Sequence, residues 1–180
     1  MNKYTKDPLL TIGTIIVLIG QGAMAIAALA LVVALPAVAL FRDTITNELR
    51  SSMEDAAFVF PMPEVVGIML MSLAVVIMMF AFFELLRRII ATVGEGDPFR
   101  PVNAGRLTKM AWLMLAVELL TFPMAGLGMR LIELFEKAAG DSEVVFGLDI
   151  SSIVMIITLF ILARVFRKGA EMRDELEGTV

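Results

Sequence analysis

The chain has 180 residues, of which 59% are hydrophobic and 19% are charged, and its formal net charge is −4. Its mean hydropathy of +0.87 lies outside the range of soluble domains, so many apolar side chains are expected to face lipid. The chain has no cysteine and no histidine, which excludes disulfides, thiolate chemistry and histidine-based sites for zinc, haem or acid–base catalysis.

Four long apolar runs predict an all-α integral membrane protein, a bundle of four transmembrane helices in a single membrane domain that covers residues 1–180. The expected spans are approximately residues 9–41, 65–83, 110–129 and 150–166.

The first run, residues 9–41, has no formal charge and, at about 1.5 Å per residue, exceeds a hydrocarbon core of about 30 Å. The helix is therefore expected to tilt, to kink at Pro36 or to project into water. A signal peptide is the alternative, because Lys3 and Lys6 precede the run and residues 37–39 resemble a cleavage site. The run is about twice as long as the apolar part of a signal peptide, which favours a retained helix.

Small residues recur on this first helix. A row with seven-residue spacing contains Gly13, Gly20, Ala27 and Ala34, and a parallel row contains Ala23, Ala30 and Ala37. Such rows form a smooth face against which another helix packs closely. The favoured interpretation is contact within one bundle, and the alternative is homo-oligomerisation through the Gly13/Gly20/Ala27/Ala34 face.

The segments between the spans carry their own patterns. A short surface helix is expected at residues 47–57. The third span is expected to be interrupted at Pro123 and to merge into an amphipathic piece, residues 129–137, that lies along the membrane surface. The fourth span is expected to continue into the tail, residues 167–180, as a charged helix.

The distribution of Lys and Arg predicts the orientation. The N-terminus, the loop 84–109 and the tail from residue 164 carry 11 of the 15 basic residues, whereas the other two loops carry 4 and hold ten carboxylates. By the positive-inside rule, both termini and the loop 84–109 are expected in the cytoplasm, with the two acidic loops outside.

The cytoplasmic loop contains the most patterned stretch of the chain. Residues 96–98 are Gly-Asp-Pro, which is typical of a turn. Phe99 is a large apolar residue in a polar loop, so it is expected to pack at the membrane interface or against helix ends. Pro101 is expected to break any helix, and Asn103 to cap the next one.

This stretch has two interpretations, one structural and one functional. The favoured interpretation is a rigid reverse turn between the second and third spans, with Phe99 as an anchor. The alternative is a docking surface for a cytoplasmic partner or for phospholipid headgroups. Its candidate contacts are Phe99, Arg100, Asn103, Arg106 and Lys109. The glycines nearby do not form a phosphate-binding loop, because no strand precedes them and no Gly-Lys-Ser/Thr follows.

Glu118 is a carboxylate within the third span, about 12 Å from the start of that span. An ionised carboxylate at this depth costs at least ~2 kcal/mol, so Glu118 is expected to be protonated, paired or facing water. Neutral candidates for a partner are Gln21, Ser72, Thr121 and Thr158. The favoured interpretation is a hydrogen-bonded group inside the bundle, and the alternative is a proton or cation site.

Two segments carry a family resemblance. They are Gly96-x-Pro98-Phe99 with Asn103 and Arg106-Leu107, and the ending Val165-Phe166-x-x-Gly169-Ala170-x-Met172-Arg173-x-Glu175-Leu176-Glu177-Gly178-Thr179-Val180. Over essentially the whole chain, the sequence resembles the bacterial domain of unknown function 2975. The resemblance implies a multi-pass protein of the bacterial inner (plasma) membrane with four helices and no established activity. Members of that family are often encoded beside a small helix-turn-helix regulator, which implies, by analogy, a membrane-bound modulator of transcription.

The leading functional hypothesis is therefore a membrane anchor or sensor whose cytoplasmic loop and tail hold a transcription-regulator-like partner. The alternative is a small oligomeric transporter or channel that uses Glu118. An enzyme is the weakest hypothesis, because no acid–base pair or metal-ligand set can be proposed. No cofactor and no direct contact with nucleic acid are expected.

Overall fold

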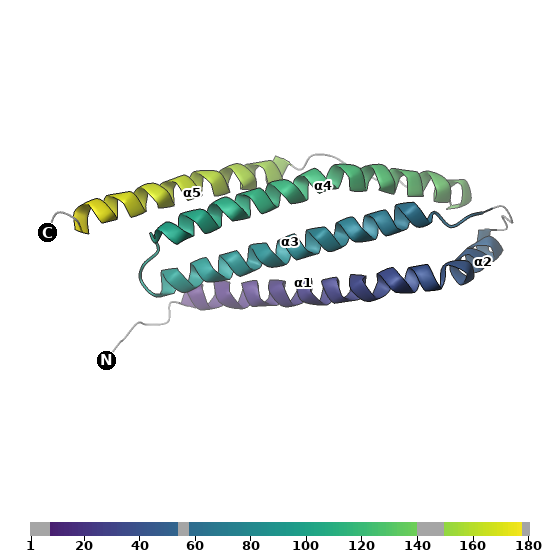
Figure 1. The fold of residues 1–180 in the computed structure, drawn as a ribbon, viewed down its shortest axis with the longest axis horizontal. Helices are drawn as coiled ribbons and strands as arrows, with labels where there is room; N and C mark the ends of the chain where they lie inside the picture. The colour runs from purple at the N-terminus through teal and green to yellow at the C-terminus, as the bar shows by residue number, and fades with distance from the viewer. Residues whose placement is uncertain (1–7, 54–57, 140–149, 178–180) are drawn as a thin grey trace. The chain divides into compact units, whose positions relative to one another are not determined.

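The computed structural model describes residues 8–53, 58–139 and 150–177. The regular secondary structure in this part of the chain is entirely α-helical, without strands (Figure 1). The helices are α1 (Pro8–Leu40), α2 (Arg42–Met53), α3 (Met62–Gly94), α4 (Pro101–Ala139) and α5 (Ile150–Glu177). Four of them, all except α2, are long and apolar enough to cross a membrane, which confirms the expected all-α fold with four apolar spans.

The helices extend well beyond the apolar runs. α3 continues to Gly94, beyond the span expected to end near residue 83, and α4 begins at Pro101, before the span expected from residue 110. Glu84 forms ion pairs with Arg87 and Arg88 at 2.9 and 2.7 Å within α3, so charged residues continue the helix instead of ending it. Hydropathy therefore located the apolar part of each helix but not its ends.

The interruption expected at Pro123 is wrong, because α4 runs through this residue to Ala139. Residues 129–137 consequently belong to α4 and are not a separate helix. Pro36 also lies inside α1. A proline removes one backbone hydrogen bond. In lipid the helix continues past it, because a helix that ended there would leave further backbone groups unpaired. The short helix expected at residues 47–57 corresponds to α2, which begins five residues earlier, and α5 continues into the tail as expected. Residues 54–57 and 178–180, which these expectations also included, lie outside the described residues.

The chain divides into two compact units, and the first comprises Met1–Ala25, Ile77–Glu118 and Leu148–Val180. Its buried core contains Ile89, Leu107, Met110, Ala111, Leu159 and Ala163. In this unit α1 packs on α3: a Cβ atom added at Gly20 would lie 2.9 Å from Cζ of Phe83, and one added at Gly13 would lie 3.7 Å from Cδ1 of Ile90. The small residues at these two positions therefore permit close helix packing within one chain.

The second unit comprises Ile26–Val76 and Leu119–Gly147. Here α3 approaches α4, because a Cβ atom added at Gly67 would lie 2.8 Å from Cδ1 of Leu127. The ring of Phe58 lies 5.8 Å from that of Phe135. Ala27 and Ala34 are half-buried in this unit, and homo-oligomerisation through the small-residue face stays a prediction.

Candidate functional site

The connection between α3 and α4 begins with a defined helix ending. Gly96 adopts a positive φ of 81°, which residues with a Cβ atom adopt only with strain. The backbone N–H of Gly96 donates to the carbonyl of Val93 (3.0 Å), and that of Asp97 donates to the carbonyl of Thr92 (3.2 Å). This pair of bonds is a Schellman motif, which satisfies carbonyls that the end of a helix leaves unpaired. The turn predicted at residues 96–98 is therefore the Schellman ending of α3, with Gly96 in the left-handed conformation.

Asn103 is fully buried and joins this turn to both helices. Its side-chain amide donates to the hydroxyl of Thr92 (2.7 Å) and to the carbonyl of Pro98 (2.9 Å). Thr92 in turn donates to the carbonyl of Ile89 (2.7 Å). Since a buried amide is costly without partners, these bonds fix the turn in one geometry.

The expectation that Asn103 caps α4 is wrong. The helix begins at Pro101, whose fixed φ suits the first helical position and whose missing N–H would have been unpaired there. The backbone N–H of Asn103 donates to the carbonyl of Arg100 (2.8 Å), so Asn103 already lies in the first turn of the helix. Pro101 consequently starts a helix rather than breaking one.

Arg106 extends the same network along α4. Its Nη1 atom donates to Oδ1 of Asn103 and to the backbone carbonyl of Arg88 in α3, both at 2.9 Å. A charged donor strengthens both bonds, and together they hold the first turns of α4 against the end of α3.

Phe99 connects the turn to α5. Its ring centroid lies 5.3 Å from that of Phe166, with the two rings tilted by 48°. A Cβ atom added at Gly169 would lie only 2.6 Å from Cδ1 of Phe99, so a side chain at this point of α5 would force the Phe99 ring to shift. Phe99 was expected to pack at the membrane interface or against helix ends. In the structure its ring packs on the side of α5, with 41% of the residue's surface still exposed.

An ion-pair network reinforces this contact. The carboxylate of Asp97 accepts a bond from Nε of Arg100 (3.0 Å) and pairs with Arg173 of α5. Arg100 also contacts Glu95 through Nη1 (2.9 Å). The hydrogen bond from Arg100 holds the pKa of the Asp97 carboxyl below its usual range, partial desolvation opposes this, and the charge of Arg173 lowers the pKa further.

Gln21 connects α1 to α3 at another point of the first unit. Its Nε2 atom donates to Oε2 of Glu84 (2.9 Å), whose carboxylate also accepts bonds from Arg87 and Arg88. Gln21, one of the neutral partners considered for Glu118, thus has a bond to α3. Glu118 is half-buried in α4, and its role in transport stays a prediction.

The structure therefore brings together four of the five candidate residues of the loop and gives each an internal contact, whereas Lys109 lines a separate groove between α3 and α4. Asn103 is buried, Arg106 and Arg100 are hydrogen-bonded within the chain, and Phe99 keeps part of its ring exposed. The residues that sequence reasoning did not assign to this site are Thr92, Asp97, Phe166, Gly169 and Arg173. The sequence did offer a way to find them, because all except Thr92 lie within the two segments that carry the family resemblance.

Among residues 8–53, 58–139 and 150–177, no group of three or more acidic side chains is arranged to hold a metal ion.

The family described as "Protein of unknown function (DUF2975)" matches residues 44–180. The chain belongs to this family. The match begins in α2 and includes α3, α4 and α5, whereas the two motifs predict a resemblance over essentially the whole chain, α1 included. Both segments that the DUF2975 resemblance singled out lie inside the match, and in the structure they contact each other. No curated protein and no solved structure matches the chain.

Proposed function

We propose that this protein is a multi-pass anchor or sensor of the bacterial inner membrane that holds a cytoplasmic, transcription-regulator-like protein at the end built by the α3–α4 turn and α5. The observation that supports this proposal most directly is the contact of Phe99 with Phe166 and Gly169, reinforced by the ion pair of Asp97 with Arg173. Through it the turn and the tail helix, 60 or more residues apart in sequence, form one continuous surface.

The exposed apolar part of that surface follows from helix register. Gly169, Met172 and Leu176 are spaced by three and four residues, so they lie on one face of α5, and Phe99 covers the first of them. Phe99, Met172 and Leu176 are 41%, 50% and 72% exposed. We call these three side chains the turn–tail surface. An apolar stripe with this spacing, on a helix with charged residues around it, suits the apolar face of a partner helix.

The orientation of this surface can be tested first, because the chain has no native cysteine. Glu95→Cys lies in the α3–α4 connection, and Thr44→Cys lies at an exposed position of α2. With a membrane-impermeant maleimide on intact cells, we expect labelling of Thr44→Cys at once and of Glu95→Cys only after the membrane is permeabilised. The reverse pattern would place the turn–tail surface outside the cytoplasm and contradict the proposal.

The partner can then be sought by purifying the full-length protein from its native membrane and identifying the proteins that co-elute. We expect a small helix-turn-helix protein, and we expect the double substitution Met172→Ser/Leu176→Ser to abolish its retention. The matched control is Asp174→Ser, which changes an exposed tail residue between these two positions. Phe99→Ala is a poorer choice, because it also removes the contact that holds α5 to the turn.

Two outcomes of this experiment would count against the proposal. One is that no regulator co-elutes from native membranes. The other is that the regulator is retained equally by the double variant and by the control, which would place its binding site elsewhere on the chain.

A further inference from the structure

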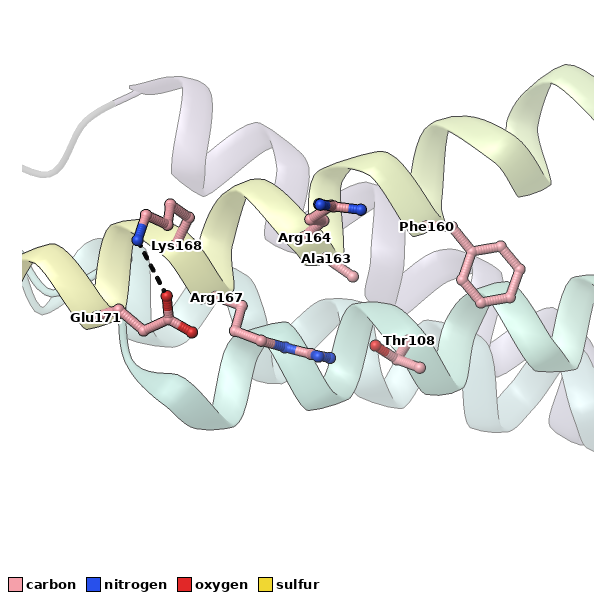
Figure 2. A pocket seen from close by; sticks show the side chains of 7 residues that line it. All are labelled: Thr108, Phe160, Ala163, Arg164, Arg167, Lys168 and Glu171. Atoms are coloured by element: carbon pink, nitrogen blue, oxygen red, sulfur yellow. Dashed lines mark hydrogen bonds and ion pairs between the residues drawn. The ribbon is translucent and has the colours of Figure 1, made fainter.

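A groove of about 650 Å³ lies between α4 and α5 in the first unit (Figure 2). Its lining consists of Thr108 from α4 and, from α5, Phe160, Ala163, Arg164, Arg167 and Lys168, with Glu171 at one end. None of these residues belongs to the turn–tail surface. Figure 2 shows the side chain of Arg167 extended toward Thr108, with Phe160 at the opposite end of the groove from Glu171.

The α5 side of the groove is one helix face whose chemistry changes along its length. The lining positions recur every three or four residues, as expected for a single face. Phe160 and Ala163 make its first part apolar, and three cations follow between Arg164 and Lys168. Eight residues separate Phe160 from Lys168, which corresponds to about 12 Å along the helix axis.

The cations of this groove are poorly neutralised. Neither Arg164 nor Arg167 has a hydrogen-bond or ion-pair partner in the part of the chain that the structure describes. Lys168 contacts Glu171 at 3.4 Å, and both side chains are more than half exposed, so this pair is largely solvated. Like charges three and four residues apart on a helix repel each other, and an anion between them would remove the repulsion.

Donors for an anion would come from α5. The hydroxyl of Thr108 donates to the carbonyl of Ala104 (2.9 Å), so it is already used within α4. Arginine presents several N–H donors in a planar fork that matches phosphate, and lysine adds a point charge. The chemistry of the charged half therefore favours a phosphate group.

The apolar half distinguishes a lipid from a soluble phosphate. Trp112 of α4 packs edge-on against Phe160, with ring centroids 5.7 Å apart, and 59% of its surface is exposed. Exposed aromatic and apolar side chains in a membrane-spanning chain face lipid, and tryptophan prefers the headgroup level. Along α5 the cations thus follow an apolar stretch, in the same order as the headgroup of a lipid follows its acyl chains.

We propose that the α4–α5 groove binds an anionic glycerophospholipid, with its phosphate between Arg164, Arg167 and Lys168 and an acyl chain along Phe160. This site is separate from the proposed partner surface and does not depend on it. A specific anionic lipid would neutralise the cations and hold α5 against α4.

The single tryptophan of the chain provides the readout. The full-length protein would be reconstituted in phosphatidylcholine bilayers that contain increasing fractions of phosphatidylglycerol, with bromine on the acyl chains of one lipid or the other. Bromine quenches tryptophan fluorescence on contact, so the two series give the relative affinity of the lipids near Trp112. We expect phosphatidylglycerol to be preferred by roughly twofold to fivefold.

The variants locate the lipid. Arg164→Gln/Arg167→Gln is expected to bring the preference close to one, and Arg167→Gln alone to reduce it. The matched single-charge control is Lys109→Gln, because Lys109 and Trp112 also line a second groove between α3 and α4. The control is expected to keep the full preference. Both arginines are exposed, so circular dichroism and thermal unfolding should show intact variants.

Several results would overturn the proposal. They are the absence of any preference in the native protein, a preference that survives the double arginine variant, and a preference that Lys109→Gln removes as completely as Arg167→Gln does. Loss of the preference in excess inorganic phosphate, but not in chloride at the same ionic strength, would show that the groove prefers soluble phosphate to a lipid.

Discussion

The polar contacts of the first unit differ in kind from the packing contacts of the second. In the first unit, side chains of Gln21, Asn103, Arg106 and Arg173 bridge one helix to another or to the turn. The described part of the second unit is packed through Gly67 on Leu127 and Phe58 on Phe135, and Nε of Arg50 donates to the carbonyl of Phe58 (2.7 Å).

The importance of these polar contacts follows from the lipid that surrounds the helices. In a bilayer, lipid chains are as apolar as the helices, so apolar burial does not by itself select one arrangement of helices over another. Hydrogen bonds and close-packed glycines do select one, because each requires particular residues to face each other. The first unit carries both kinds of contact around one turn, and we therefore expect substitutions there to have larger effects than equivalent substitutions in the second unit.

The largest effect is expected for Asn103→Ala. The substitution removes a fully buried amide and leaves the carbonyl of Pro98 and the guanidinium of Arg106 each without one partner. We expect the free energy of unfolding to fall by about 2–4 kcal/mol. Unfolding of the purified protein by SDS in mixed micelles, followed by circular dichroism, measures this change.

The control is Asn47→Ala in α2, because this asparagine is exposed and belongs to the second unit. We expect its effect to stay below about 0.5 kcal/mol. Equal losses for the two variants would show that the Asn103 network does not distinguish the two units.

A smaller loss is expected for Gly169→Ala, because the new Cβ atom would lie 2.6 Å from the ring of Phe99. We expect a net loss of about 1–2 kcal/mol, since overpacking costs about 1–3 kcal/mol and alanine recovers some of this through its higher helix propensity. In a Phe99→Ala background the same substitution should become neutral or stabilising, because the ring that it meets is gone. A double-mutant cycle of unfolding free energies measures this coupling.

Gly126→Ala in α4 is the counterpart in the second unit, where nothing lies within 4 Å of the added Cβ atom. It is expected to leave stability unchanged or slightly raised. Purely additive effects of Gly169→Ala and Phe99→Ala would show that Phe99 does not pack on α5 in the folded protein.

The smallest effect concerns pH. Because the pKa of Asp97 is lowered in the folded protein, chiefly by the hydrogen bond from Arg100, the stabilisation that it provides is complete above about pH 5. It is lost as the pH falls from the unfolded pKa of about 3.9 through the lowered folded value, where the folded carboxylate becomes protonated. Unfolding measured at neutral and at acidic pH should show this loss in the native chain and a smaller loss in Asp97→Asn.

Asp43→Asn is a suitable comparison, because this carboxylate is 96% exposed and lies 3.9 Å from Arg42. We expect Asp43→Asn to keep the full difference between the two pH values. An identical pH dependence in Asp97→Asn and the native chain would show that the ion pairs of Asp97 with Arg100 and Arg173 do not stabilise the fold.

The sequence by itself determined the class of fold and the place of the turn. Four apolar runs of sufficient length predict four spans, since helices satisfy their own backbone in lipid, and Gly96 with Pro98 predicts the turn between α3 and α4. The helices extend beyond the apolar runs that define the expected spans. Hydropathy reports where a helix contacts lipid, whereas charged side chains that pair along the helix, as Glu84 does with Arg88, allow it to continue.

Only the tertiary structure decided which residues of the turn meet which residues of the helices. Asn103 was expected at a helix cap and lies in a buried network, and the close contact at Gly169 comes from a ring 70 positions earlier in the chain. Periodicity and composition describe each segment separately, so they cannot specify such pairs. Close packing and hydrogen bonding between segments specify them, because they depend on which faces of α3, α4 and α5 come together.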